Sequence, residues 1–200
     1  MEPFTRLTAV ALPIDQPNLD TDQIIPARFL GEPRAKQVQG LFHDLRYDTA
    51  RRPRPEFVLN QPAYADARIV VAERNFACGS SRETAVTVLV DNGFRAYIAP
   101  SFGDIFFNNC FQNGALPIRL DAARVAAIRT ALHATPGALV TIDLANQTVV
   151  GPDGQTDRFE IDSFRKDCLL RGVDEINLTL GYEAEIARFE ERQGRELNWL

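Results

Sequence analysis

The chain has 200 residues, of which 45% are hydrophobic and 24% are charged, and its formal charge is −5. This composition is typical of a globular protein with a sizeable core, and the absence of a basic excess argues against a nucleic-acid-binding function. No apolar run approaches the roughly 18 residues of a membrane-spanning helix, and the amino-terminal segment has an acid at Glu2 and no long apolar core, so we expect a cytoplasmic protein without a signal peptide.

The first third of the chain combines one strand with long irregular stretches. Residues 7–12 form a short apolar run before Pro13 and predict a strand. The segment that follows is rich in Asp, Asn and Pro and predicts a loop, whereas residues 29–62 are charged, contain proline and show little periodicity. We expect the latter to form an exposed excursion with one short helix around 35–46. Such long irregular segments are often binding loops.

Strands and helices then alternate. Strands are predicted at 67–73, 95–100 and 115–120, and helices at 83–92, 101–114 and 121–137. Gly93 can end the first of these helices in a left-handed conformation. The helix at 121–137 has the clearest pattern, since Asp121 can cap it and Val125, Ile128 and Leu132 share one face.

The last third of the chain changes pattern. Residues 138–162 alternate in polarity and contain turn signals at 146–147 and 153–154, which predicts antiparallel hairpins. Two helices are expected after them, at 163–172 and from 173 to near the end. Alternating strands and helices followed by hairpins predict an α/β fold with a mixed sheet.

The segment Gly79-Ser80-Ser81-Arg82-Glu83 joins a predicted strand to a predicted helix. Ser80 and Glu83 fit a capping box, which is a purely structural interpretation. The same position suits a ligand, because helix starts after buried strands attract anions. Arg82 offers a planar donor for a carboxylate or phosphate, and a serine oxygen here could be held as an alkoxide. The pattern alone leaves both interpretations open, although the order of residues does not match the nucleophile elbow of serine hydrolases.

Other polar residues gather in two loops: Asp20, Thr21, Asp22 and Arg28 in the first, and Ser101, Asp104, Asn108 and Asn109 in the second. The two close aspartates could bind a metal ion or orient a base, and Asx turns explain them equally well. The polar residues of the second loop could form a site or satisfy the end of a helix.

The cysteines and histidines give no sign of a metal site. Cys78, Cys110 and Cys168 lie far apart without a C-x-x-C pair or a cluster-ligand run. We therefore expect buried thiols, and no metal bound by this chain. His133 falls in the last turn of the predicted helix at 121–137, where a cationic side chain suits the helix dipole.

Four segments together point to a family. They are DTDQIIPARFL at 20–30, NFACGSSRE at 75–83, APSFGDIFFNNCFQNGALPI at 99–118 and RKDCLLRGVDEI at 165–176. In this order they resemble the small-subunit family of bacterial 3-isopropylmalate dehydratases, which is similar to the swivelling C-terminal domain of aconitases. The resemblance extends over residues 7–200. It implies a single swivelling β/β/α domain at 1–200, with residues 29–62 as an irregular excursion.

The resemblance also implies an activity. It indicates a hydro-lyase subunit that is active only in a heterodimer with a large subunit and interconverts 2-isopropylmalate and 3-isopropylmalate, by dehydration and rehydration, in leucine biosynthesis. A [4Fe-4S] cluster is expected on the large subunit, acting as a Lewis acid on the substrate, and no cofactor is expected on this chain. The expected ligand is a hydroxy-dicarboxylate, and neither nucleic acid nor a membrane is an expected partner.

Site residues follow from the same resemblance. It implies that Ser80 is the base that removes the proton next to a carboxylate and that Ser81 holds the substrate or the oxyanion. Arg82 is implied to pair with a substrate carboxylate, and Arg28 to be a further substrate-binding residue.

The chain departs from the family pattern at Ala77, before Cys78, and at Thr84, after Glu83. Two alternatives therefore stay open. One is a paralogous hydro-lyase subunit that acts on a related methylated hydroxy acid. The other is a non-catalytic module that binds anions.

Overall fold

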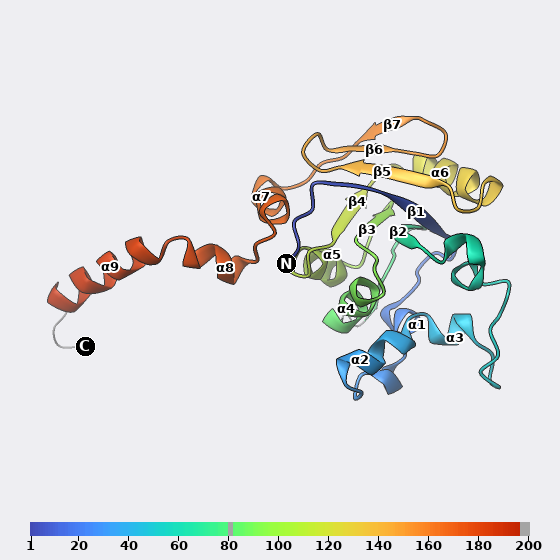
Figure 1. Ribbon diagram of the computed structural model, residues 1–200, viewed down its shortest axis with the longest axis horizontal. Helices are drawn as coiled ribbons and strands as arrows, with labels where there is room; N and C mark the ends of the chain where they lie inside the picture. Colours follow the sequence, from blue (N-terminus) through green and yellow to red (C-terminus); the bar gives the residue numbers. More distant parts are fainter. Residues whose placement is uncertain (80–81, 197–200) are drawn as a thin grey trace.

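Figure 1 shows the computed structural model, which describes residues 1–79 and 82–196. The described residues contain one seven-stranded sheet in the order β4-β3-β2-β1-β5-β6-β7. Its strands are β1 (Arg6–Ile14), β2 (Ala67–Ala72), β3 (Ala96–Ala99), β4 (Leu116–Arg119), β5 (Leu139–Asp143), β6 (Thr148–Val150) and β7 (Thr156–Arg158). β1 to β4 are parallel, and β5 to β7 add antiparallel neighbours. The predicted mixed α/β fold is confirmed.

The sheet is covered on both faces (Figure 1). The longer helices of the body are α4 (Glu83–Asp91), α5 (Asp104–Gln112), α6 (Ala122–Ala134) and α7 (Ser163–Arg171). Along β2, Val70 packs in the core with α4 and α5, whereas Ile69 and Val71 pack in the core with α6. This alternation is what a strand buried on both faces requires, because successive side chains point to opposite faces.

The helix α6 buries Val125, Ile128 and Leu132 as predicted, whereas Asp121 occupies the N-cap position without a capping bond from its side chain. The helix α4 ends as expected, with Gly93 at φ +92°. The hairpin turns also appear where the sequence places them, with Gln147 and Gly154 at positive φ.

The excursion at 29–62 differs from its prediction. It contains short helical turns rather than one helix: η1 (Ala27–Phe29), α2 (Arg34–Gln37), η2 (Val38–Gly40), α3 (His43–Arg46) and η3 (Val58–Asn60), between α1 (Thr21–Ile24) and η4 (Pro62–Tyr64). Phe42 interrupts the helical run at φ +49°, and its ring packs 5.7 Å from that of Phe57. Leu41 and Phe42 are fully buried, so the expectation of an exposed excursion is wrong at its centre, where apolar side chains join the main core.

The C-terminal part leaves the body after α7. Gly172 ends α7 at φ +68°, and α8 (Glu175–Leu180) and α9 (Glu183–Glu196) then extend away from the sheet (Figure 1). The described part of α9 contains no buried residue. None of the helices in residues 1–79 and 82–196 has the length and apolar character needed to cross a membrane.

Candidate active site

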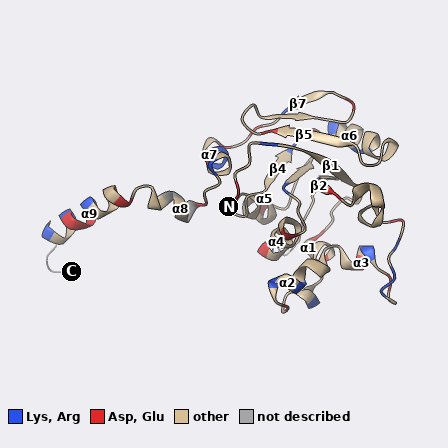
Figure 2. Cartoon of the chain, viewed as in Figure 1, with Lys and Arg blue, Asp and Glu red and all other residues tan. Residues whose placement is uncertain are grey.

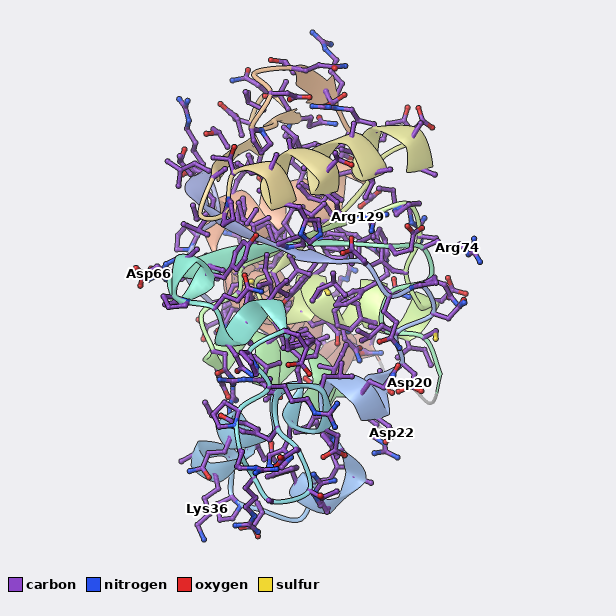
Figure 3. The ribbon with its side chains drawn as sticks, turned by 90° about the vertical axis from the view of Figure 1, so that its right-hand side faces the viewer. Asp20, Asp22, Lys36, Asp66, Arg74 and Arg129 are labelled. Carbon is purple, nitrogen blue, oxygen red and sulfur yellow. The ribbon has the colours of Figure 1, made fainter. Side chains whose placement is uncertain are left out.

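Three loops meet where β1, β2 and β3 end. The segment after β2 lies between the other two, because the Thr21 N–H donates to the Cys78 carbonyl (3.0 Å) and the Gly103 N–H donates to the Phe76 carbonyl (2.9 Å). The Cys78 N–H in turn donates to the Leu19 carbonyl (3.2 Å). Figure 3 shows Asp20, Asp22 and Arg74 on one side of the molecule. The predicted motifs at 20–30, 75–83 and 99–118 are therefore adjacent in space.

The backbone of the central segment is strained. Asn75, Ala77 and Gly79 all have positive φ, at +57°, +57° and +88°. Asparagine and glycine tolerate this region, whereas alanine in it costs of order 1–2 kcal/mol because of its Cβ. Such strain persists only where the surroundings fix the backbone, and it is frequent at functional sites. Hydrogen bonds to both neighbouring loops provide that constraint here.

Gly103 and Ser101 fix the segment from the third loop. A Cβ on Gly103 would lie 2.4 Å from the Ala77 carbonyl oxygen, so only glycine allows this approach. The Ser101 hydroxyl accepts a hydrogen bond from the Asn75 N–H at 2.8 Å. Ser101 therefore positions the strained segment, a role that the sequence did not indicate. The predicted helix at 101–114 begins later, at Asp104, because residues 101–103 bond to this segment.

The predicted start of the helix α4 at Glu83 is confirmed, but its N-cap residue is not the predicted Ser80. The helix α4 begins at Glu83, with Arg82 in the N-cap position at φ −111° and ψ 131°. The Glu83 carboxylate accepts a hydrogen bond from the Asn113 amide at 3.3 Å. Ser80 and Ser81, the predicted base and its neighbour, lie outside the described residues, and their roles stay predictions.

Arg82 and Asp22 come together from two of the motifs. Arg82 Nη1 donates to Asp22 Oδ1 at 2.9 Å, and their side chains are 33% and 57% exposed. Asp20 has a different role, because its carboxylate caps α1 through the Gln23 N–H (2.8 Å) in a capping box. Helix capping thus explains Asp20, whereas Asp22 holds the predicted substrate-binding arginine. Between them, Thr21 is only 2% exposed.

Arg28 points into the excursion. Its guanidinium forms a bidentate ion pair with Asp44 and lies 2.8 Å from His43 Nδ1. The hydrogen bond from Arg28 lowers the pKa of Asp44 to about 2. The described contacts of Arg28 do not join it to Arg82, so its substrate role remains a prediction. These residues line a cavity of about 600 Å³ together with basic side chains of the excursion, Lys36 and Arg51. Figure 2 marks basic positions of the chain in blue.

Three other residues singled out in the sequence, Asn108, Asp104 and His133, lie in or at the ends of helices. The Asn108 amide oxygen accepts from Arg165 at 2.8 Å, and Asp104 lies in the first turn of α5. His133 Nε2 lies 2.7 Å from the Asp15 carboxylate, and this contact accounts for its position in addition to the helix end. Residues 1–79 and 82–196 contain no group of three His, Cys, Asp or Glu side chains that could hold a metal ion.

Of the three thiols, Cys110 and Cys168 are buried, and burial raises the pKa of Cys110 well above its usual range. Cys78 is half-buried beside the central segment, with Sγ 3.4 Å from the Asn18 carbonyl oxygen.

Comparisons with known proteins identify the family of this chain. A family model for the aconitase C-terminal domain matches residues 1–123, and a model described as LeuD_N matches residues 126–163. The 3-isopropylmalate dehydratase small subunit of Paramagnetospirillum magneticum is 50% identical over 201 residues, which span all of both chains. That of Hahella chejuensis is 50% identical over 210 residues, which cover 100% of this chain and 98% of the other.

A solved structure supports the fold. The crystal structure of 3-isopropylmalate dehydratase from Methanocaldococcus jannaschii superposes with a TM-score of 0.66, at 23% sequence identity, over 92% of this chain and 98% of that one. The sequence resemblance and its aconitase-type swivel fold are confirmed. The chain therefore belongs to the family of 3-isopropylmalate dehydratase small subunits.

Proposed function

We propose that this chain is the small subunit of a 3-isopropylmalate dehydratase of leucine biosynthesis. Together with a large subunit it would interconvert 2-isopropylmalate and 3-isopropylmalate by dehydration and rehydration, and its proposed location is the cytoplasm. The observation that carries the proposal is the junction of the strained segment ending at Gly79 with the Arg82–Asp22 pair, at the start of α4. This junction brackets the two serines that the family resemblance implicates in catalysis.

In this proposal Ser80 is the base. It removes the proton from the carbon next to a substrate carboxylate, the hydroxyl on the neighbouring carbon leaves as water, and the reverse addition gives the isomer. A serine hydroxyl is a weak base unless its alkoxide is stabilised. We propose that this stabilisation comes from the N-terminal field and the first-turn amides of α4, which begins three residues after position 80 in the sequence. Ser81 would help to hold the substrate.

Arg82 is proposed to bind a substrate carboxylate. A guanidinium has five N–H donors, and the described bond to Asp22 uses only Nη1. Asp22 can therefore fix the direction of the guanidinium while donors remain for the substrate. A planar fork of this kind matches the geometry of a carboxylate, which lysine does not.

The iron–sulfur cluster is proposed to belong to the large subunit. The described residues do not fit such a group, because no three Cys, His, Asp or Glu side chains converge. The cysteines are also separated in the fold: Cys110 lies in α5, Cys168 in α7 and Cys78 after β2. The acid–base and substrate-binding roles proposed above are those of this chain's own residues.

The test is reconstitution. The chain alone should show no turnover of isopropylmalate, and turnover should appear when the large subunit is added. Ser80→Ala should lower kcat by about 10²–10⁴-fold, the usual contribution of a general base, whereas Ser163→Ala, at an exposed serine in α7, should leave it unchanged. Full turnover in a folded Ser80→Ala variant would refute the base assignment. Running the same assay with citraconate establishes which alkyl group the site prefers.

A further inference from the structure

The arm formed by α8 and α9 (residues 175–196) ends in a helix, α9, of which no residue is buried. Figure 1 shows it extending away from the sheet on the side where β1 begins. Its base is fixed, because the Phe4 N–H donates to the Leu169 carbonyl (2.8 Å) and the N-terminal ammonium donates to the Gly172 carbonyl (3.1 Å). A firmly anchored segment thus presents a helix to solvent.

One side of this arm is apolar. Tyr182, Ile186 and Phe189 recur at spacings of four and three residues, which places them on one side of the helix. Their exposed fractions are 58%, 43% and 51%. We call these three residues the arm stripe. The opposite side is charged and includes the Glu191–Arg195 ion pair. Figure 2 shows acidic and basic positions along α9 in red and blue.

An isolated amphipathic helix of this length is unstable in water. Helices shorter than about 12–15 residues are marginal without tertiary packing, and most helical stability in proteins comes from burying an apolar face. The helix α9 has 14 residues and the described chain buries none of them. An uncovered apolar stripe with a polar border is typical of a surface that binds another protein.

We propose that the arm stripe is a docking surface for the large subunit. The family is that of a small subunit, so a large partner exists for it. The relative from Paramagnetospirillum magneticum matches this chain over its whole length, including the arm, although the two domain models end at residue 163. The arm is therefore shared with that relative but lies outside the matched domains. This inference rests on the proposed function, since it assigns the partner of that function.

Charge favours a large subunit over a second copy of this chain. The helix α9 contains five Glu and three Arg, and the whole chain has a formal charge of −5. A second copy would bring the same negative charge to the interface, and like charges disfavour association. The arm stripe fits instead a partner with an apolar groove bordered by basic side chains.

The arm also lies apart from the candidate active site. It joins the body near the amino end of β1, where Phe4 contacts the end of α7, whereas the site loops follow the carboxyl ends of β1, β2 and β3. Weakening the docking surface should therefore change the affinity for the large subunit without changing the chemistry in the assembled enzyme.

The experiment uses the full chain and a matched pair of double variants. Ile186→Glu with Phe189→Glu places two charges in the arm stripe. Ala184→Glu with Ala187→Glu places the same two charges on the other side of the same helix, at exposed positions. The dissociation constant for the cognate large subunit is measured by titration calorimetry, kcat is measured at saturating large subunit, and the association state of each chain alone is measured by sedimentation.

We expect the stripe variant to bind the large subunit at least about tenfold more weakly, as loss of apolar anchors does, with kcat at saturation and the melting temperature of the body unchanged. The control variant should bind like the wild type. Equal affinities for all three chains, or equal weakening in both variants, would overturn the proposal. The proposal would also be overturned if the wild-type chain alone formed a dimer in sedimentation and only the stripe variant failed to form it. Failure of the wild-type chain to bind or activate any large subunit would instead refute the proposed function.

Discussion

Gly103→Ala tests how closely the third loop must approach the strained segment. The backbone at Gly103 has φ −60° and ψ 134°, which alanine adopts without strain. The methyl group would nevertheless lie 2.4 Å from the Ala77 carbonyl oxygen, 3.1 Å from its carbonyl carbon and 3.2 Å from the Cys78 Cα. All three are backbone atoms, so no side chain can rotate to make room.

The expected cost follows from these distances. Ordinary contact requires 3.4 Å or more, so residues 77–78 or residues 101–103 must move by roughly 1 Å. Overpacking of this kind costs about 1–3 kcal/mol, and the lower entropy of the unfolded alanine variant offsets about 0.4–1 kcal/mol. We expect a net loss of about 1–2 kcal/mol in the free energy of unfolding. A shift of about 1 Å next to Ser80 should also lower kcat by roughly 10²-fold.

Urea denaturation measures the free energy of unfolding, and turnover with saturating large subunit measures kcat. Gly31→Ala is the matched control, because a Cβ there meets nothing within 4 Å. It should leave kcat unchanged and the free energy of unfolding unchanged or slightly higher. If Gly103→Ala behaves like this control in both assays, the close approach does not position the catalytic segment and the argument from the Cβ contacts fails.

Three further predictions concern the rest of the molecule. The Tyr97 hydroxyl is buried without a hydrogen-bond partner among the described residues, so Tyr97→Phe should raise the free energy of unfolding in urea by about 1 kcal/mol; a decrease would reveal a partner. Arg28→Gln should raise the pKa of Asp44 from about 2 toward its ordinary 3.8, as an NMR titration of that carboxylate would show. Because the folded-state pKa is the lower one, the pair stabilises the protein above pH 3.8 and this effect is lost as the pH falls toward 2. Ile128→Ala should lower the free energy of unfolding by about 2–5 kcal/mol through the cavity it leaves in the core against α6, and a loss below 1 kcal/mol in urea would show that the site collapses.

Periodicity predicts the regular parts of this fold because it records which side of an element is buried. The strand β2 is apolar at nearly every position, since both faces of the sheet are covered there. The helix α6 shows its apolar residues at helical spacing, since only one side contacts the sheet. In both elements the buried side follows from the local pattern of apolar residues, so the sequence alone is sufficient to predict the element and its buried residues.

The N-cap residue of α4 could not be predicted in the same way. A capping box is a local signal, and the sequence contains one at Ser80 and Glu83. The N-cap position is instead taken by Arg82 in an extended conformation, and its guanidinium donates to Asp22, 60 positions away. The burial of Leu41 in the excursion is missed for the same reason, because the residues that cover it are distant in sequence.

The Arg82–Asp22 pair also explains how an arginine can be both fixed and available. An exposed pair contributes about 0–1 kcal/mol, and both partners here retain substantial exposure. A buried pair would hold its arginine far more strongly, because breaking it leaves an uncompensated charge in a medium of low dielectric constant. A substrate carboxylate can therefore share or replace Asp22 at little cost. The half-exposed position of this pair is compatible with the substrate-binding role proposed for Arg82.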